Sequence, residues 1–187
     1  MTEDLHQALQ VLKDGGVIVY PTDTIWGIGC DATNPAAVAS VYDIKQREDS
    51  KSMLVLVHSE SMLSSYIDQV PEIAWELLDA AANPMTVIYP GAKNLAKNLV
   101  AGDGSMGIRV TGDDFCSELI RRFRKPIVST SANLSGHPSP ALFDEIDAEI
   151  LEKADYVVKW RQDDLHRASP SSVIRLGTGG QIEILRK

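Results

Sequence analysis

The chain has 187 residues, of which 44% are hydrophobic, and this composition predicts a folded domain with a sizeable core. Its net charge of -8 argues against a protein that coats nucleic acid through a broad basic face, while a local basic pocket stays compatible with it. No apolar run approaches the ~20 residues that a membrane helix needs, and the acidic N-terminus shows no signal peptide. We therefore expect a cytoplasmic protein without a membrane partner, in which Cys30 and Cys116 are buried free thiols.

Helices and strands are predicted to alternate along the chain. Apolar residues at helical spacing predict a first helix over residues 5–12, which the pair Gly15-Gly16 ends. Further helices are predicted over residues 34–45, 60–67, 71–80, 113–123 and 144–153. Strands are predicted over residues 17–20, 53–57, 85–89, 106–110, 127–129, 156–158, 172–176 and 182–185, and glycines at 177–180 join the last two into a hairpin. This pattern predicts an α/β fold with a mixed sheet in a single domain over residues 1–187.

One predicted strand, behind Lys125-Pro126, ends in a run of hydroxyls and an amide, Ser129-Thr130-Ser131-Ala132-Asn133. Ligands bind at strand ends in open α/β sheets, so this rim is a candidate site. A polar loop with local side-chain caps is the alternative reading of the same residues. No GxSxG pattern surrounds these serines, which weakens a serine-hydrolase reading.

Other motifs point away from common sites. Two glycine patterns, at residues 27–32 and 102–107, lack the strand-then-helix context of a dinucleotide fingerprint, and no GxxxxGK[ST] is present. The four histidines are scattered without metal-ligand spacing, so we predict no metal site.

Cations are the second candidate feature. Arg109 lies inside an apolar strand, where an unpaired charge is costly, so either a protein carboxylate or a ligand must satisfy it. Lys45, Arg47 and Lys51 follow a helix, where a solvated helix end is the simpler reading, and Arg186 ends the last strand. If these cations gather in one cleft of an acidic protein, they indicate an anionic ligand.

Together these stretches resemble the YrdC family of L-threonylcarbamoyladenylate synthases, over nearly the whole chain. The resemblance rests on several separate motifs that recur in order. They are Pro21-Thr22-Asp23-Thr24 with Trp26-Gly27 (PT[DE]T-x-[YW]G), Lys45-Gln46-Arg47 (KxR), Arg109-Val110, Ser129 to Gly136 (STSAN-x-SG), Pro170-Ser171-Ser172-Val173-Ile174 (PST-[IV]-[IV]) and Leu185-Arg186.

The chain departs from the family pattern at several positions. Glu48 replaces the proline of KxRP, Leu56 replaces a histidine that some members carry, and Asn83-Pro84-Met85-Thr86 replaces PGP[LV]T. Because the chain ends at Lys187, we expect the accessory C-terminal domain of longer members to be absent.

The resemblance implies an α/β, twisted open mixed sheet with flanking helices and a large concave cleft. It implies a nucleotidyltransferase that converts L-threonine, bicarbonate or CO2, and ATP into threonylcarbamoyl-AMP and pyrophosphate. Mg²⁺ is expected to arrive with the ATP, without a tightly bound cofactor. The adenylate then passes to the machinery that modifies adenosine 37 of ANN-decoding tRNAs, with weak contact to tRNA or duplex RNA.

The family match also assigns roles to single residues. Thr24, Arg109, Ser129 and Ser172 are predicted to bind threonine. ATP is predicted to contact Arg47, Lys51, Ser105, Ser131, Asn133, Ser139 and Arg186. No protein nucleophile is expected, and Lys45, Arg47 and Arg109 position the substrates. Two alternatives remain open: an RNA-binding module of the same fold, and a related carbamoyl-adenylate-forming domain of hydrogenase maturation.

Overall fold

The computed structural model describes residues 1–46 and 53–187. Three residues discussed above, Arg47, Glu48 and Lys51, lie outside this part of the chain. The described strands form one sheet in the order β7-β1-β2-β6-β3-β5-β4-β8-β9. Their bounds are β1 Ile18–Tyr20, β2 Gly27–Gly29, β3 Leu54–Val57, β4 Met85–Tyr89, β5 Met106–Val110, β6 Ile127–Ser131, β7 Tyr156–Val157, β8 Ser172–Leu176 and β9 Ile182–Arg186.

Parallel and antiparallel pairs both occur in this sheet. The pairs β1–β7, β3–β5 and β4–β8 are parallel, and the remaining neighbours are antiparallel. This confirms the predicted mixed α/β sheet and its C-terminal hairpin. Strand β2 was not predicted, because Gly27-Ile28-Gly29 reads as a loop. Position 29 in β2 requires glycine, because a Cβ on Gly29 would lie 1.7 Å from the Val128 carbonyl oxygen.

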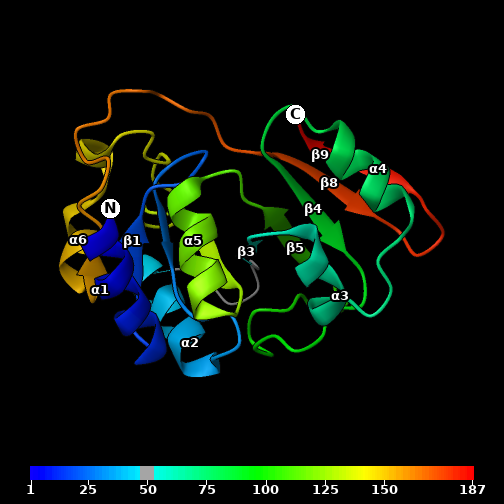
Figure 1. Ribbon diagram of the computed structural model, residues 1–187, viewed down its shortest axis with the longest axis horizontal. Coiled ribbons are helices and arrows are strands. Elements are labelled where there is room, and N and C mark those ends of the chain that lie inside the picture. The colour runs from blue at the N-terminus through cyan, green and yellow to red at the C-terminus, as the bar shows by residue number, and fades with distance from the viewer. Residues whose placement is uncertain (47–52) are drawn as a thin grey trace.

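Helices flank the sheet on both faces (Figure 1). Those described are α1 Thr2–Lys13, α2 Pro35–Lys45, α3 Leu63–Tyr66, α4 Ile73–Ala80, α5 Asp114–Phe123 and α6 Ala148–Lys153, with 3-10 turns η1 Glu60–Met62 and η2 Phe143–Glu145. The predicted helices over 60–67 and 144–153 thus begin as separate 3-10 turns. None of the described helices is long and apolar enough to cross a membrane.

Helices α1 and α5 pack against each other and cover part of one face of the sheet. A stripe of apolar residues makes this contact, including Leu12 of α1 and Phe115 and Leu119 of α5, all fully buried. The Asp113 carboxylate begins α5 by accepting a 2.8 Å hydrogen bond from the backbone N–H of Cys116.

Strand alternation gives the two faces of the sheet different chemistry. On β4, β5 and β8, the residues Val87, Ile108 and Ile174 point into the larger core on the face opposite α1 and α5. Their neighbours Gly107 and Arg109 on β5 point to the other face, beside the part that α1 and α5 cover. That face therefore has a covered part and an open part.

Candidate functional site

A cleft of about 340 Å³ occupies the open part of this face. Its walls come from segments far apart in the sequence: the loop after β1, strands β4 to β6, and the β8–β9 hairpin. Among the predicted site residues it is lined by Thr24, Ser105, Arg109, Ser129, Ser131, Ser139 and Arg186. The tertiary structure thus gathers side chains that the sequence spreads over more than 160 positions into one concave site.

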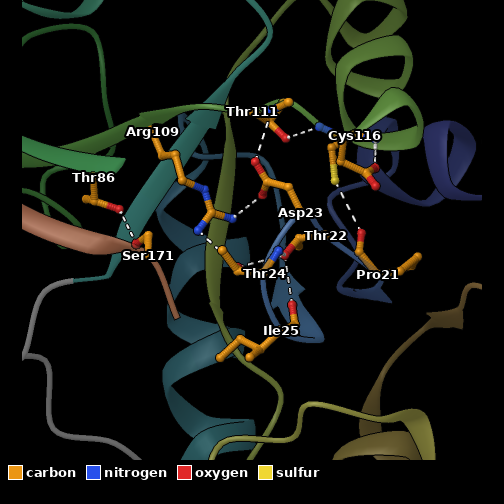
Figure 2. A network of polar contacts seen from close by, with 12 residues as sticks. Pro21, Thr22, Asp23, Thr24, Ile25, Thr86, Arg109, Thr111, Cys116 and Ser171 are labelled. Carbon is orange, nitrogen blue, oxygen red and sulfur yellow. Dashed lines mark hydrogen bonds and ion pairs between the residues drawn. The ribbon is translucent and has the colours of Figure 1, made fainter. Parts of the chain in front are cut away.

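Arg109 is the deepest charge in the cleft, with 4% of its side chain exposed. Its Nη2 lies 3.0 Å from Asp23 Oδ1, and its Nη1 donates a 3.1 Å hydrogen bond to the Thr24 hydroxyl (Figure 2). The sequence left open whether a protein carboxylate or a ligand pairs with this arginine. In the structure, Asp23 is that carboxylate. The pair leaves Arg109 Nε buried and without a hydrogen-bond partner among the described residues.

Neighbouring hydroxyls fix the orientation of Thr24. The Thr22 hydroxyl donates to the Ile25 carbonyl over 2.8 Å and accepts the Thr24 backbone N–H over 3.0 Å. Because that single Thr22 proton is committed, the Thr24 hydroxyl donates across the 2.9 Å contact between the two side chains. Thr24 therefore presents a lone pair to Arg109, and its proton points away from the guanidinium.

Two buried neutral groups anchor this part of the sheet. The Tyr20 hydroxyl donates a 2.9 Å bond to the Val128 carbonyl, next to Ser129, and the Cys116 thiol donates to the Pro21 carbonyl over 3.3 Å. Burial raises the pKa of the Tyr20 phenol and of the Cys116 thiol well above their ordinary values. Both groups stay protonated and keep donating, which holds the strand ends that carry Thr24 and Ser129.

Lys45 and Asn133 act on the backbone of the loop after β6. The buried Lys45 Nζ donates to the carbonyls of Ser131 and Asn133, the second over 2.6 Å. The Asn133 amide donates to the carbonyls of Leu134 and His137 over 2.9 and 2.7 Å. Neither residue is among the described residues that line the cleft, so their visible contribution is to shape the loop that presents Ser131.

The β8–β9 hairpin places its residues differently from the sequence prediction. Strand alternation turns Ser171, Val173 and Arg175 into the cleft, whereas Ser172 shares the opposite face with the core residue Ile174. Ser172 is thus absent from the cleft lining among the described residues. Ser171 stands there instead, with its hydroxyl 2.8 Å from that of Thr86 (Figure 2).

A β-bulge aims Arg186 at the cleft. Ile174 pairs with Ile184, but Val173 pairs with Arg186, so β9 carries one extra residue, Leu185, at this point. The extra residue reverses the alternation and brings Arg186 to the cleft face together with Val173. The Arg186 Nε then donates a 2.8 Å hydrogen bond to the Ser171 carbonyl, which holds the guanidinium at the rim.

The electrostatics of the cleft oppose those of the whole chain. Its described lining contains three arginines and no acidic residue, although the net charge of the protein is -8. Arg109 and Arg186 were predicted; Arg175 was not, because a cation in an edge hairpin reads as an ordinary exposed residue. This arrangement suits an anionic ligand.

Sequence reasoning also missed three other features of the site. Asp23 was noted as a carboxylate in the loop at the end of the first predicted strand, but its ion pair with Arg109 was not predicted. Trp26 forms a wall of the cleft and is tilted against Phe143, with ring centroids 5.1 Å apart. Thr86, in the departing segment, is buried beside Ser171.

Ser105 is already engaged on one side. Its hydroxyl and backbone N–H both donate to Asp103 Oδ1, over 2.6 and 2.9 Å, and these bonds lower the pKa of the Asp103 carboxyl. Ser105 can therefore offer a ligand only a lone pair while this turn is intact. Within residues 1–46 and 53–187, no group of three or more His, Cys, Asp or Glu side chains could hold a metal ion.

An open mixed α/β sheet with a hydroxyl-lined, arginine-bearing cleft has the architecture and charge that suit small anionic ligands. The family model Sua5_yciO_yrdC, described as telomere recombination, matches residues 10–187. The chain therefore belongs to the Sua5/YciO/YrdC family, which confirms the resemblance drawn from the motifs.

Single relatives give the same result. A threonylcarbamoyl-AMP synthase of Vibrio parahaemolyticus is 31% identical over 185 residues, which cover 94% of this chain and all of the relative. The crystal structure of E. coli YciO matches with a TM-score of 0.86 at 25% identity, covering all of this chain and 90% of that one. P. abyssi Sua5 complexed with L-threonine shares the fold, with a TM-score of 0.80 at 23% identity over 92% of this chain and 50% of that one.

Proposed function

We propose that this chain is an L-threonylcarbamoyladenylate synthase that uses L-threonine, bicarbonate or CO2, and ATP. One observation carries the proposal: a buried arginine and two rim arginines meet hydroxyl groups in a single cleft without an acidic residue in its described lining. ATP and the threonine carboxylate are both anions, so such a cleft favours them over neutral or cationic ligands. The names of relatives at about 30% identity over most of the chain support the same assignment.

In the proposed reaction, the threonine amine attacks the carbon of CO2 and loses a proton, which gives a carbamate. A carbamate oxygen then attacks the α-phosphorus of ATP, the bond to the β-phosphate bridging oxygen breaks, and pyrophosphate leaves. This sequence needs positioning and charge neutralisation rather than a protein nucleophile. Mg²⁺ enters with the triphosphate and offsets part of its charge.

We assign threonine to the deep end of the cleft. Arg109 would bind the carboxylate with the N–H groups that Asp23 and Thr24 leave free, and Thr24 and Ser129 would supply hydroxyls. Because Ser171 rather than Ser172 lines this wall, we transfer the predicted role of Ser172 to its neighbour.

We assign ATP to the rim. Ser131, Ser139 and Arg186 line it, and Arg175 adds a charge that fits a phosphate. Ser105 would accept a hydrogen bond from the ligand, and Lys45 and Asn133 would act by shaping the loop. The predicted roles of Arg47 and Lys51 remain predictions, since these residues lie outside the described part of the chain.

Pyrophosphate release tests this function. The purified chain is incubated with ATP and Mg²⁺, with and without L-threonine and bicarbonate, and the products are examined by mass spectrometry. We expect release to require both small substrates and to accompany an acyl-adenylate of the threonylcarbamoyl mass. Equal release with neither substrate present would contradict a synthase.

RNA binding is the competing reading of the same fold. With a net charge of -8, we expect tRNA to bind weakly and to dissociate as salt is raised. Tight binding of tRNA in ~200 mM salt, above the ionic strength of the cell, together with no substrate-dependent pyrophosphate release, would favour an RNA-binding module.

A further inference from the structure

We propose that Asp23 is a positioning residue, which orients Arg109 for the carboxylate of the amino-acid substrate. The inference rests on the proposed function, because it concerns the same site. It assigns a specific task to a carboxylate that would otherwise be only the counter-ion of a buried arginine.

The geometry around the guanidinium carries the first step. Arg109 is held at two different nitrogens, by the Asp23 carboxylate at Nη2 and by the Thr24 hydroxyl at Nη1, over 3.0 and 3.1 Å (Figure 2). Two fixed contacts on a planar group set both its position and its rotation. The Nε of Arg109 is buried and has no hydrogen-bond partner among the described residues, so this donor remains for a ligand.

Asp23 can impose this orientation because it is itself held. Its Oδ2 accepts a 3.0 Å hydrogen bond from the backbone N–H of Gly112, in the turn between β5 and α5. Its Oδ1 is buried and, apart from the ion pair with Arg109, has no hydrogen-bond partner among the described residues. Each member of the pair therefore depends on the other, and the carboxylate joins the loop after β1 to the turn after β5.

The consequence for binding is preorganisation. A long side chain that is already in its bound orientation loses less conformational freedom when a ligand arrives, and the ligand is bound more tightly. Without the Asp23 charge, the guanidinium would keep the Thr24 contact and at most a weaker, neutral contact at Nη2, and it would sample other rotamers. Threonine should then bind more weakly, while ATP at the rim should bind almost as before.

Asp23→Asn is the direct test, because it removes the charge and keeps the shape. We measure L-threonine and ATP affinities by calorimetry, and KM and kcat from pyrophosphate release. We expect threonine affinity to fall at least tenfold, ATP affinity to change by less than twofold, and KM for threonine to change more than kcat. Asp23→Glu keeps a carboxylate one methylene further out, and should lose several-fold in threonine affinity, less than Asp23→Asn.

Asp31→Asn is the matched control. Asp31 is also a buried carboxylate, paired with Lys125 Nζ over 2.6 Å, and it does not line the cleft. This variant should lower the melting temperature and leave threonine affinity unchanged. It thereby separates a loss of stability from a loss of orientation.

Three results would overturn the proposal. If Asp23→Asn binds threonine as well as wild type, Asp23 serves only stability. If it binds threonine more tightly, Asp23 is a competitor that occupies Arg109 until substrate arrives. If Asp23→Asn does not fold and Asp23→Glu keeps full affinity, orientation is not its task. A wild-type protein that binds ATP but no threonine would instead contradict the proposed function, and the inference with it.

Discussion

The two parts of one sheet face differ in what covers them. Around β1, α1 and α5 bury an apolar stripe that includes Leu12 and Leu119. Over β4, β5 and β8, the cleft replaces that helical layer, and Arg109, Arg175 and the Thr86 hydroxyl lie beneath it beside the apolar Ile88 and Val173. The same strand alternation that buries apolar side chains in one part thus presents polar ones in the other. The comparison indicates that one part of this face contributes mainly to stability and the other mainly to ligand binding, and the substitutions of Arg109, Leu12 and Arg186 below test that separation.

Arg109→Ala should have the largest effect, because Arg109 contributes both to ligand binding and to stability. Threonine-dependent turnover should fall by a factor that corresponds to roughly 2–5 kcal/mol, the typical loss for one desolvated charge contact. Stability should also fall, by about 3–5 kcal/mol, because Asp23 is left as a buried charge. Pyrophosphate release and denaturant unfolding measure the two losses.

The control for this variant is Arg121→Ala. Arg121 is an exposed arginine of α5 whose partner is Glu118. It should keep both turnover and stability near wild type. Undiminished threonine binding in folded Arg109→Ala would show that the pair with Asp23 is purely structural.

Leu12→Ala tests the covered part alone. Leu12 is 1% exposed in the α1–α5 layer, and loss of its side chain should lower the free energy of unfolding by about 2–5 kcal/mol. Because Leu12 lies outside the cleft lining, KM values of the folded fraction should match wild type. Urea unfolding and initial rates at low temperature provide the measurements; a KM shifted more than a few-fold would mean that the two parts are coupled.

Arg186→Ala tests the rim of the open part. Removing one charge-assisted contact from a partly exposed site should weaken ATP binding about tenfold, equivalent to ~1.4 kcal/mol. Threonine affinity and melting temperature should change little. Arg167→Ala, an exposed arginine paired with Glu145, is the control. Equal losses of ATP affinity in the two variants would indicate a general charge effect rather than a site contact.

Asp147 should give the smallest effect, visible as a pH dependence. Hydrogen bonds from the Leu134 N–H and the His137 ring lower the pKa of the Asp147 carboxyl. Since the folded pKa lies below the unfolded one, this carboxylate stabilises the protein above its unfolded pKa, and the contribution is lost as pH falls through the folded pKa.

Melting temperatures of wild type and Asp147→Asn, measured from pH 7 down to about pH 3, should therefore converge at the acid end, below the ordinary Asp pKa of about 3.9. A constant difference over the whole range would show that Asp147 does not stabilise the loop through its charge.

Much of this molecule follows from local patterns in the sequence. Period-2 and helical spacings predicted most strands and helices, the ordered motifs identified the family, and the family match named seven residues that line the cleft. These inferences succeed because alternation and capping depend on near neighbours along the chain. The position of Arg109 inside an apolar strand also predicted that this arginine needs a partner, because burying an unpaired charge is costly.

Only the tertiary structure determined which carboxylate pairs with Arg109 and which side chains of the β8–β9 hairpin face the cleft. Asp23, in the loop after β1, meets Arg109 on β5 although β2, β6 and β3 lie between these two strands in the sheet, and no local pattern encodes this contact. The alternation of β8 selects Ser171 over Ser172, and the extra residue Leu185 turns Arg186 into the cleft. Register and bulges depend on the neighbouring strand, and a change of one residue moves a side chain to the opposite face.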